Sequence, residues 1–256
     1  MIIDKVLETA APYLEKRTVK DLVIGLALIA VELDNGDIGI SYTLREHLPP
    51  GCSSFSFARD VIGKDAVEVA ELAKRGTDDA QRGVGMAVLT AASRSQDLSD
   101  IETFKSSFGV EILPEDTVGM IGFIPSIAAK FPKGSKNLII FDIAVSKFGE
   151  EIENVYPMKD QAKLLPKCDV VILTGTTMIN HTIDDLLKIC SKARDIVMVG
   201  ASTPMFPEAF RDTNVKTLAG SWWDNSNKEE LFKIISTAGG INSLNKFMIK
   251  KAVAVK

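Results

Sequence analysis

Hydroxyl, amide and imidazole side chains are concentrated directly after one buried apolar run. Residues 170–173 are Val-Val-Ile-Leu, the pattern of a strand buried on both faces of a sheet. Seven residues that could contribute to a binding site follow this run, six with polar side chains and one a glycine with a flexible backbone. They are Thr174, Gly175, Thr176, Thr177, Asn180, His181 and Thr182. Such groups orient a polar ligand or coordinate a metal ion. Because open α/β sheets bind ligands where a strand ends and a helix begins, this segment predicts a ligand site, although it identifies no reaction.

A structural explanation of the same segment is also open. Thr182 could cap the helix that begins near Asp184 and Asp185, and the other polar residues could form the turn before it. One cap does not require so many polar residues, so we favour a site. His181 is the candidate metal ligand, although a surface or capping histidine is the commoner case. His47 is the only other histidine, and two histidines are too few for a metal constellation.

A second candidate site is the sequence Gly-Met-Ile-Gly-Phe-Ile-Pro at 119–125, which departs from the dinucleotide fingerprint G-x-G-x-x-G. Gly122, followed by Phe123, allows a ligand close to the backbone, and Pro125 suits a first helical turn whose N–H groups face an anion. Asp142 lies 20 positions after Gly122, where an acid contacts a ribose hydroxyl. The other interpretation is a tight turn at Gly122 and a solvated carboxylate at Asp142.

A third group follows the apolar run at 196–199, where Gly-Ala leads to Ser202, Thr203 and Pro204. Neighbouring strand ends that carry small hydroxyl residues would face one crevice, which adds these three residues to the candidate ligand site. Helix capping by Ser202 or Thr203 ahead of Pro204 explains them equally well.

The elements that must position these groups alternate along the second part of the chain. Strands are predicted at 118–121, 138–143, 170–173, 196–199 and 215–219. Helical segments are predicted at 125–131, 158–165, after 182, before 210 and at 228–238. This alternation is typical of parallel β-α crossovers, and it predicts an α/β fold with a Rossmann-like, doubly wound parallel sheet.

The first part of the chain follows a different order. We expect a helix over 1–17, β structure over 19–33, a tight turn at Asn35–Gly36 and a returning strand over 38–44. Glu32 is expected to be an exposed strand carboxylate, or else to project toward the second domain. Two helices follow at 66–74 and 78–94, with Thr77 as the cap of the second. The predicted domains are therefore a smaller α+β domain at 1–96 and the Rossmann-like domain at 97–256.

Composition excludes several classes of protein. The net charge of −4 supplies no basic excess for nucleic acid, and no apolar run is long enough to span a membrane. The N-terminal segment has no uncharged signal-peptide core, so we expect a cytoplasmic protein. Cys168 and Cys190 fit a core, whereas Cys52 is the candidate exposed thiol, and the three have no disulfide or zinc spacing. Stacked helices or an edge strand could support a homo-oligomer.

The segments VGMIGFIP, VVILTGTTMINHT and VGASTP resemble the DUF364 family over nearly the whole chain. The hairpin region VKDLVIGLALIAVELDNGDIGISYTL resembles the DUF4213 unit of that family, which is similar to the enolase N-terminal domain. This resemblance implies a site in the cleft between the two units and a proposed role in heavy-metal chelation.

Two functions are favoured, and a structural or regulatory protein with a degenerate Rossmann unit is a third option, against which the paired polar strand ends argue. One is the handling of a small molecule, a divalent heavy metal or a metal chelate in the interdomain cleft, with hydrogen bonds from the strand-end loops. The other is an enzyme that depends on a nucleotide or S-adenosylmethionine, with Gly122 at the phosphate or methionine end and Asp142 on the ribose. Ser-His-Asp, P-loop and HExxH patterns are absent from the sequence, so the residues do not choose an enzymatic reaction.

Overall fold

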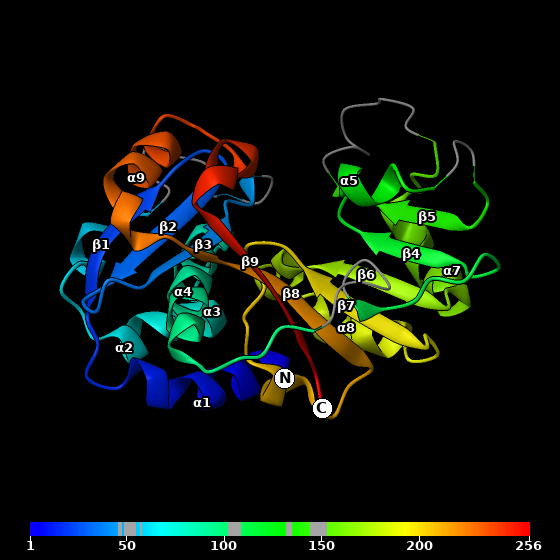
Figure 1. The fold of residues 1–256 in the computed structure, drawn as a ribbon, viewed down its shortest axis with the longest axis horizontal. Coiled ribbons are helices and arrows are strands. Elements are labelled where there is room, and N and C mark those ends of the chain that lie inside the picture. The colour runs from blue at the N-terminus through cyan, green and yellow to red at the C-terminus, as the bar shows by residue number, and fades with distance from the viewer. Residues whose placement is uncertain (46–47, 49–54, 57, 102–108, 132–134, 144–152) are drawn as a thin grey trace.

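Two β-sheets organise the molecule, as the computed structural model shows (Figure 1). The structure describes residues 1–256 except 46–47, 49–54, 57, 102–108, 132–134 and 144–152. His47 and Cys52 lie outside the described residues. The mixed α/β architecture with a larger, mostly parallel sheet and a separate small sheet confirms the predicted fold class.

The small sheet is antiparallel and has the order β1-β2-β3. Helix α1 (Ile2–Leu14) precedes β1 (Val19–Ile24), β2 (Leu28–Leu33) and β3 (Ile38–Tyr42). The β-rich run at 19–33 is two strands, because the Gly25 N–H donates to the Leu28 carbonyl at 2.8 Å and the chain turns there. The predicted Asn35–Gly36 turn joins β2 to β3, and Gly36 has the positive φ (+87°) that such a turn requires.

Helix α4 (Asp79–Ala92) covers one face of this sheet, beside α2 (Ala66–Ala70) and α3 (Leu72–Arg75). The approach is close, since a Cβ at Gly39 would lie 2.0 Å from the Ala87 carbonyl oxygen. The predicted cap at Thr77 is wrong by one residue. Asp78 caps α4, because its Oδ1 accepts the N–H groups of Ala80 and Gln81 at 2.9 Å each.

The large sheet has the order β5-β4-β6-β7-β8-β9. Its first five strands are parallel: β5 (Leu138–Phe141), β4 (Val118–Ile121), β6 (Val170–Thr174), β7 (Asp195–Val199) and β8 (Val215–Trp223). The shorter helices that join them are α5 (Pro125–Ala128), α7 (Gln161–Leu164) and α8 (Ile183–Ile189). The chain passes from β4 to β5 on one side, then to β6 on the other. The strand order therefore switches between β4 and β6, the place where such sheets bind ligands.

The end of the chain returns to the first sheet. Helix α9 (Lys228–Ser236) and the 3-10 helix at Ile241–Phe247 cover the face opposite α4, and β9 (Met248–Ala254) then pairs antiparallel with β8. Figure 1 shows α9 beside β1 and β2, far along the chain from both. The described part of the chain contains no helix long and apolar enough to cross a membrane.

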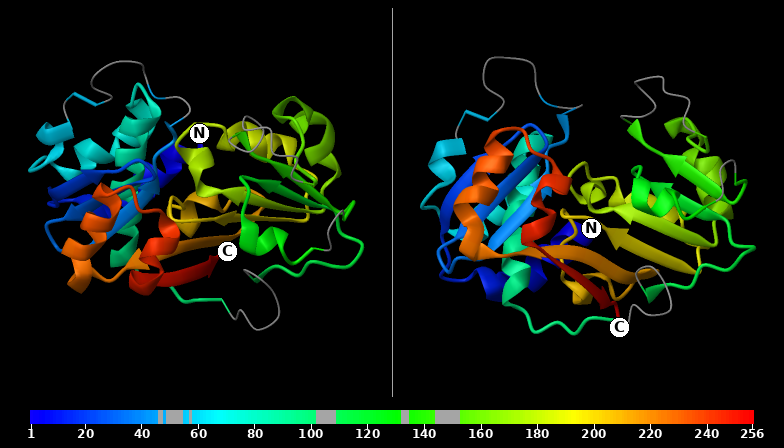
Figure 2. Two further views of the ribbon diagram at one scale, coloured as in Figure 1. Left: turned by 90° about the horizontal axis from the view of Figure 1, so that it is seen from above. Right: turned by 45° about the horizontal axis from the view of Figure 1, so that its top comes forward.

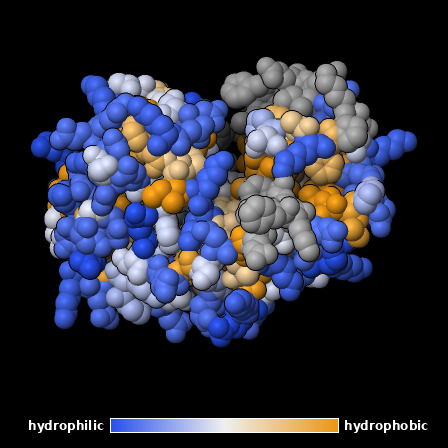
Figure 3. Space-filling model, in the orientation of Figure 1, coloured by the Kyte–Doolittle hydropathy of each residue, from blue (hydrophilic) through white to orange (hydrophobic). Residues whose placement is uncertain are grey.

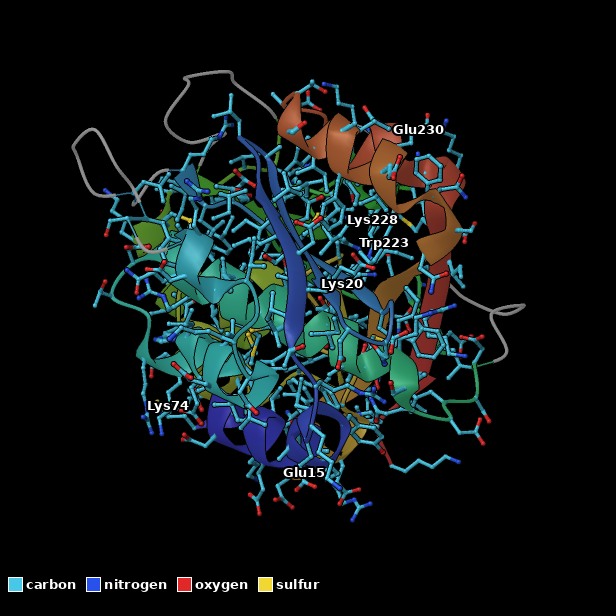
Figure 4. All side chains as sticks on the ribbon, turned by 90° about the vertical axis from the view of Figure 1, so that its left-hand side faces the viewer. Glu15, Lys20, Lys74, Trp223, Lys228 and Glu230 are labelled. Atoms are coloured by element: carbon cyan, nitrogen blue, oxygen red, sulfur yellow. The ribbon has the colours of Figure 1, made fainter. Side chains whose placement is uncertain are left out.

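Glu32, which was expected on an exposed strand surface, is buried by the C-terminal segment that returns to the small sheet. Its side chain is only 7% exposed and forms ion pairs with Lys20 at 2.8 Å and Lys228 at 3.4 Å. Figure 4 labels Lys20, which lies on the small sheet, and Lys228, which is the first residue of α9. The expectation of an ordinary exposed carboxylate is wrong, because Glu32 projects toward α9, which lies between β8 and β9 of the large sheet in the chain.

Candidate functional site

Gly122 and Thr174 bring the carboxyl ends of β4 and β6 into contact. Gly122 has a φ of +84°, and its N–H donates to the Phe141 carbonyl at the end of β5 at 2.8 Å. A Cβ at position 122 would lie 2.9 Å from Thr174 Cγ2. The glycine is therefore required by a left-handed backbone and by a neighbouring side chain, both of which belong to the protein itself.

Asp142 lies beside this glycine, as the sequence spacing predicts. It directly follows β5, and its Oδ2 accepts the Phe123 N–H at 2.7 Å. Pro125 is exposed and is the first residue of α5, which has four residues. The structure thus brings Gly122, Phe123 and Asp142 together at the ends of β4 and β5.

Two threonine hydroxyls lie at the neighbouring end of β6. Thr174 and Thr176 are both partly exposed, and their Oγ1 atoms lie 3.2 Å apart. Thr177 differs, because its side chain is buried and its hydroxyl donates to the Thr174 carbonyl at 2.8 Å. The partly exposed hydroxyls of Thr174 and Thr176 are therefore the polar groups that β6 contributes at the strand switch.

Ser202, Thr203 and Pro204 are buried. Ser202 Oγ accepts the Tyr42 N–H at 2.9 Å, which links the end of β7 to the end of β3. The loop also touches the end of β6, because a Cβ at Gly175 would lie 2.5 Å from the Thr203 nitrogen. The two strand-end loops are therefore together, as expected. The capping interpretation is wrong, since the next helical turn begins only at Pro207.

The loop at 180–182 faces α3 of the N-terminal unit. His181 Nε2 lies 2.8 Å from the Ala73 carbonyl oxygen, and a carbonyl only accepts, so Nε2 carries the proton in this contact. Asn180 Oδ1 accepts the Thr182 hydroxyl at 2.7 Å. Thr182 is the first flanking residue of α8, but its side chain makes no capping hydrogen bond. The interpretation of Thr182 as a helix cap is therefore wrong for its hydroxyl.

Arg82 on α4 is a residue that the sequence analysis missed. Its Nε donates to the Ile179 carbonyl at 2.6 Å, its Nη1 donates to the Gly76 carbonyl at 2.9 Å, and its Nη2 pairs with the buried Asp79. It thereby joins the loop after β6 to the N-terminal unit. The signal in the sequence is a long cation within a helix of small, buried residues, three positions after an aspartate.

The described residues do not fit a directly coordinated metal ion. Among them, no group of three or more His, Cys, Asp or Glu side chains could hold one. Cys168 and Cys190 are buried, and this burial raises the pKa of Cys168 to about 11 and that of Cys190 to about 12. Both thiols are therefore protonated near neutral pH, whereas the thiolate is the metal ligand.

The strand-switch edge faces the space between the two units. Figure 2 shows the green β4–β5 segment apart from the blue N-terminal sheet, with the yellow strands between them. Figure 3 shows the surface hollowed between the same two parts of the molecule. Contacts of Ser202, His181 and Arg82 join the two units.

Comparisons with known proteins agree with this two-unit architecture. The model of the DUF364 family, described as "Putative heavy-metal chelation", matches residues 106–254, and the DUF4213 model, with the same description, matches residues 7–93. An uncharacterized protein of Methanocaldococcus jannaschii is 25% identical over 86% of each chain.

Two crystal structures, both of DUF364-family proteins with unknown function, have the same fold. The protein from Pyrococcus horikoshii has a TM-score of 0.77 at 21% identity and covers 100% of each chain. The protein from Desulfitobacterium hafniense has a TM-score of 0.78 at 19% identity and covers 99% of this chain and 97% of its own. Because the DUF364 model matches more than half of its residues, the chain belongs to the DUF364 family.

Proposed function

We propose that the protein binds a small polar ligand, either a chelator or a metal chelate, at the carboxyl edge of β4 and β6. The observation that carries the proposal is the pair of partly exposed hydroxyls at the switch in strand order, where the Oγ1 atoms of Thr174 and Thr176 lie 3.2 Å apart. The Thr174 and Thr176 hydroxyls supply hydrogen bonds there, and the hollow between the units gives access.

The ligand is proposed as a chelate because the family description suggests a metal, whereas the described side chains do not form a site for a bare metal ion. Both matching family models are described by heavy-metal chelation. The described residues nevertheless lack a set of His, Cys, Asp and Glu side chains that would hold a bare ion. Hydroxyl groups bind an organic chelator by hydrogen bonds, and the chelator then carries the metal as cargo.

Thermal unfolding of the full chain tests this function with three additions: a divalent metal alone, citrate alone, and the metal–citrate complex. We expect stabilisation by citrate or by the complex, but not by the bare metal. At a hundredfold excess over the dissociation constant, the stabilisation is about 2.7 kcal/mol.

The Thr176→Val variant removes the hydroxyl with little change in shape, and it should lose that stabilisation. Thr237→Val is the matched control, because its exposed hydroxyl donates to the Lys233 carbonyl at the end of α9. Stabilisation by the bare metal alone, retained in Thr176→Val, would overturn the proposal.

A second candidate is an enzyme that uses a nucleotide or S-adenosylmethionine. It is favoured by the position of Asp142 beside Phe123, since an acidic residue after the second strand contacts a ribose in related folds. Asp142→Ala should weaken the binding of adenosine-containing ligands and leave the binding of other ligands unchanged. If no such ligand raises the melting temperature of the wild-type chain, this candidate is dismissed.

A further inference from the structure

The Thr176 hydroxyl lies in the short, irregular loop between β6 and α8. This loop contains one 3-10 turn of four residues, Gly175–Met178, and its His181 has a left-handed φ of +57°. The Thr176 carbonyl accepts the N–H groups of Ile179 and Asn180, at 2.9 and 3.2 Å. The conformation at Thr176 therefore depends on how the peptide group between residues 179 and 180 is held.

Arg82 of the N-terminal unit holds this peptide group from the other side. The Ile179 carbonyl accepts the Arg82 Nε–H at 2.6 Å. The N–H of the same peptide group belongs to Asn180, and it donates to the Thr176 carbonyl at 3.2 Å. One peptide group therefore links Arg82 to Thr176 through two hydrogen bonds, each of which polarises the other. Rotation of that peptide group would break both of them.

The Arg82 guanidinium is itself fixed by the N-terminal unit. Its Nη1 donates to the Gly76 carbonyl at 2.9 Å, and its Nη2 pairs with Asp79, which is only 1% exposed. The Arg82 side chain is 18% exposed, so solvent screens these contacts little. The planar guanidinium holds its N–H donors at fixed angles, whereas a lysine ammonium is a point charge on a flexible stem. An arginine can therefore transmit the position of α4 to the loop after β6.

We propose that Arg82 is a positioning residue for the ligand site: it orients the peptide group between residues 179 and 180, and thereby the Thr176 hydroxyl, without contacting the ligand. The inference rests on the proposed function for the place of the ligand. It deepens that function, because the N-terminal unit then determines the geometry of a site whose hydroxyls belong to the other unit. Ligand binding and the Arg82 contact favour each other, since a coupling between two equilibria is reciprocal.

Hydrogen exchange measured by NMR on the wild-type chain tests this reciprocity. The probe is citrate or its metal complex, whichever stabilises the chain. It should slow the exchange of the Arg82 Nε–H and the Asn180 amide at least about fivefold, the lower end of typical couplings between sites. The Trp222 Nε1–H is the control, because it donates to Ser93 Oγ at 3.2 Å in another contact between the units. Its exchange should not change, and an Arg82 with a merely structural role would behave in the same way.

Arg82→Lys tests the coupling by substitution, because it keeps a positive charge beside Asp79 but loses the planar set of donors. It should weaken citrate binding about tenfold, as the loss of one hydrogen bond from a charged group allows, and speed exchange of the Asn180 amide in the unliganded chain. Gln96→Ala is the matched control, since Gln96 Nε2 donates to the Met205 carbonyl at 2.6 Å, also between the units. It should leave citrate affinity unchanged. The dispersion of the remaining amide signals reports whether each variant is folded.

Equal effects of the probe on the Arg82 Nε–H and the Trp222 Nε1–H would overturn the inference, and this result requires no variant. A folded Arg82→Lys chain with unchanged citrate affinity would overturn it as well. If neither citrate nor its metal complex stabilises the wild-type chain, the proposed function fails instead. Exchange of the Asn180 amide in unliganded Arg82→Lys then still decides whether Arg82 orients the loop, and an unchanged rate would show that it does not.

Discussion

Gly122 is constrained both by its left-handed backbone and by the neighbouring Thr174 side chain. A comparison with Gly63, which shares only the backbone constraint, separates the two effects. Gly122 and Gly63 both have a φ of +84°, but only at Gly122 would a Cβ meet Thr174, because nothing lies within 4 Å of one at Gly63. We expect Gly63→Ala to lose about 1–2 kcal/mol of unfolding free energy from left-handed strain. Gly122→Ala should lose about 1 kcal/mol more, because Thr174 must move. Urea unfolding measures both, and equal losses would contradict the contact.

Ser202 provides a second prediction for a single residue. Ser202→Ala removes the acceptor of the partly buried Tyr42 N–H, and the unsatisfied donor should cost about 1 kcal/mol of unfolding free energy. Ser236→Ala is the control, since its exposed hydroxyl bonds only to the Lys233 carbonyl and the change should stay within about 0.5 kcal/mol. Losses of the same size in both variants would show that Ser202 does not join the units.

The same residue marks the limit of prediction from the sequence at this scale. The spacing of Gly122 and Asp142 correctly predicts that they lie together, because the ends of adjacent parallel strands share one edge. A serine after a strand could bind a ligand, cap a helix or accept a hydrogen bond from a distant backbone group. The partner of Ser202 is 160 positions away, so its role depends on packing between units that no local pattern contains. That the predicted residues bind a ligand stays a prediction.

At the scale of elements, the apolar strands of the large sheet were predictable, including the edge strand β5, and the antiparallel edge strand β9 was not. Most of β4, β6 and β7 is a continuous apolar run, which the sequence identifies directly. β9 contains Lys250 and Lys251, which interrupt its apolar residues, and only Val253 is buried in it. Its pairing with β8 depends on α9 first turning the chain back.

Arg194, just before β7, joins that strand to the turn before β4. Its guanidinium donates to both Asp116 oxygens, at 2.9 and 2.8 Å, and holds the pKa of this carboxyl below its usual value. A lowered pKa in the folded state means that the pair stabilises the fold above the ordinary aspartate pKa. The stabilisation is lost as the pH falls through the lowered value.

Arg194→Gln should therefore lower the free energy of unfolding near pH 7, and the loss should be modest because Arg194 is exposed. The difference from the wild-type chain should disappear in acid. Lys188→Gln, which breaks the fully exposed pair with Asp185, should change little at any pH. Urea unfolding at several pH values measures both variants, and a pH-independent loss in Arg194→Gln would refute the ion-pair explanation.

At the scale of the whole molecule, the two units share one chain segment. The family models match 7–93 and 106–254 in succession, yet α9 from the second region covers the sheet of the first. Figure 4 places Trp223 where the large sheet meets this shared segment, and its side chain is fully buried. The helical pattern of α9 was predictable from its sequence. Its partner was not, because an apolar helix face fits either sheet.

This shared segment determines whether the first unit is stable alone. A fragment of residues 1–96 would expose Leu28, Ala30, Ile38 and Ile40, which α9 and the segment around Leu244 bury in the whole chain. An uncovered apolar sheet face in a fragment of this size leaves too little core for a stable fold. We expect the fragment to show poorly dispersed NMR signals and no cooperative urea transition. The same fragment joined by a flexible linker to residues 224–247 should regain both, whereas a linked version with Leu231→Asp and Ile235→Asp should not. A cooperative transition in the bare fragment would refute this dependence and would support a unit that ends near residue 96.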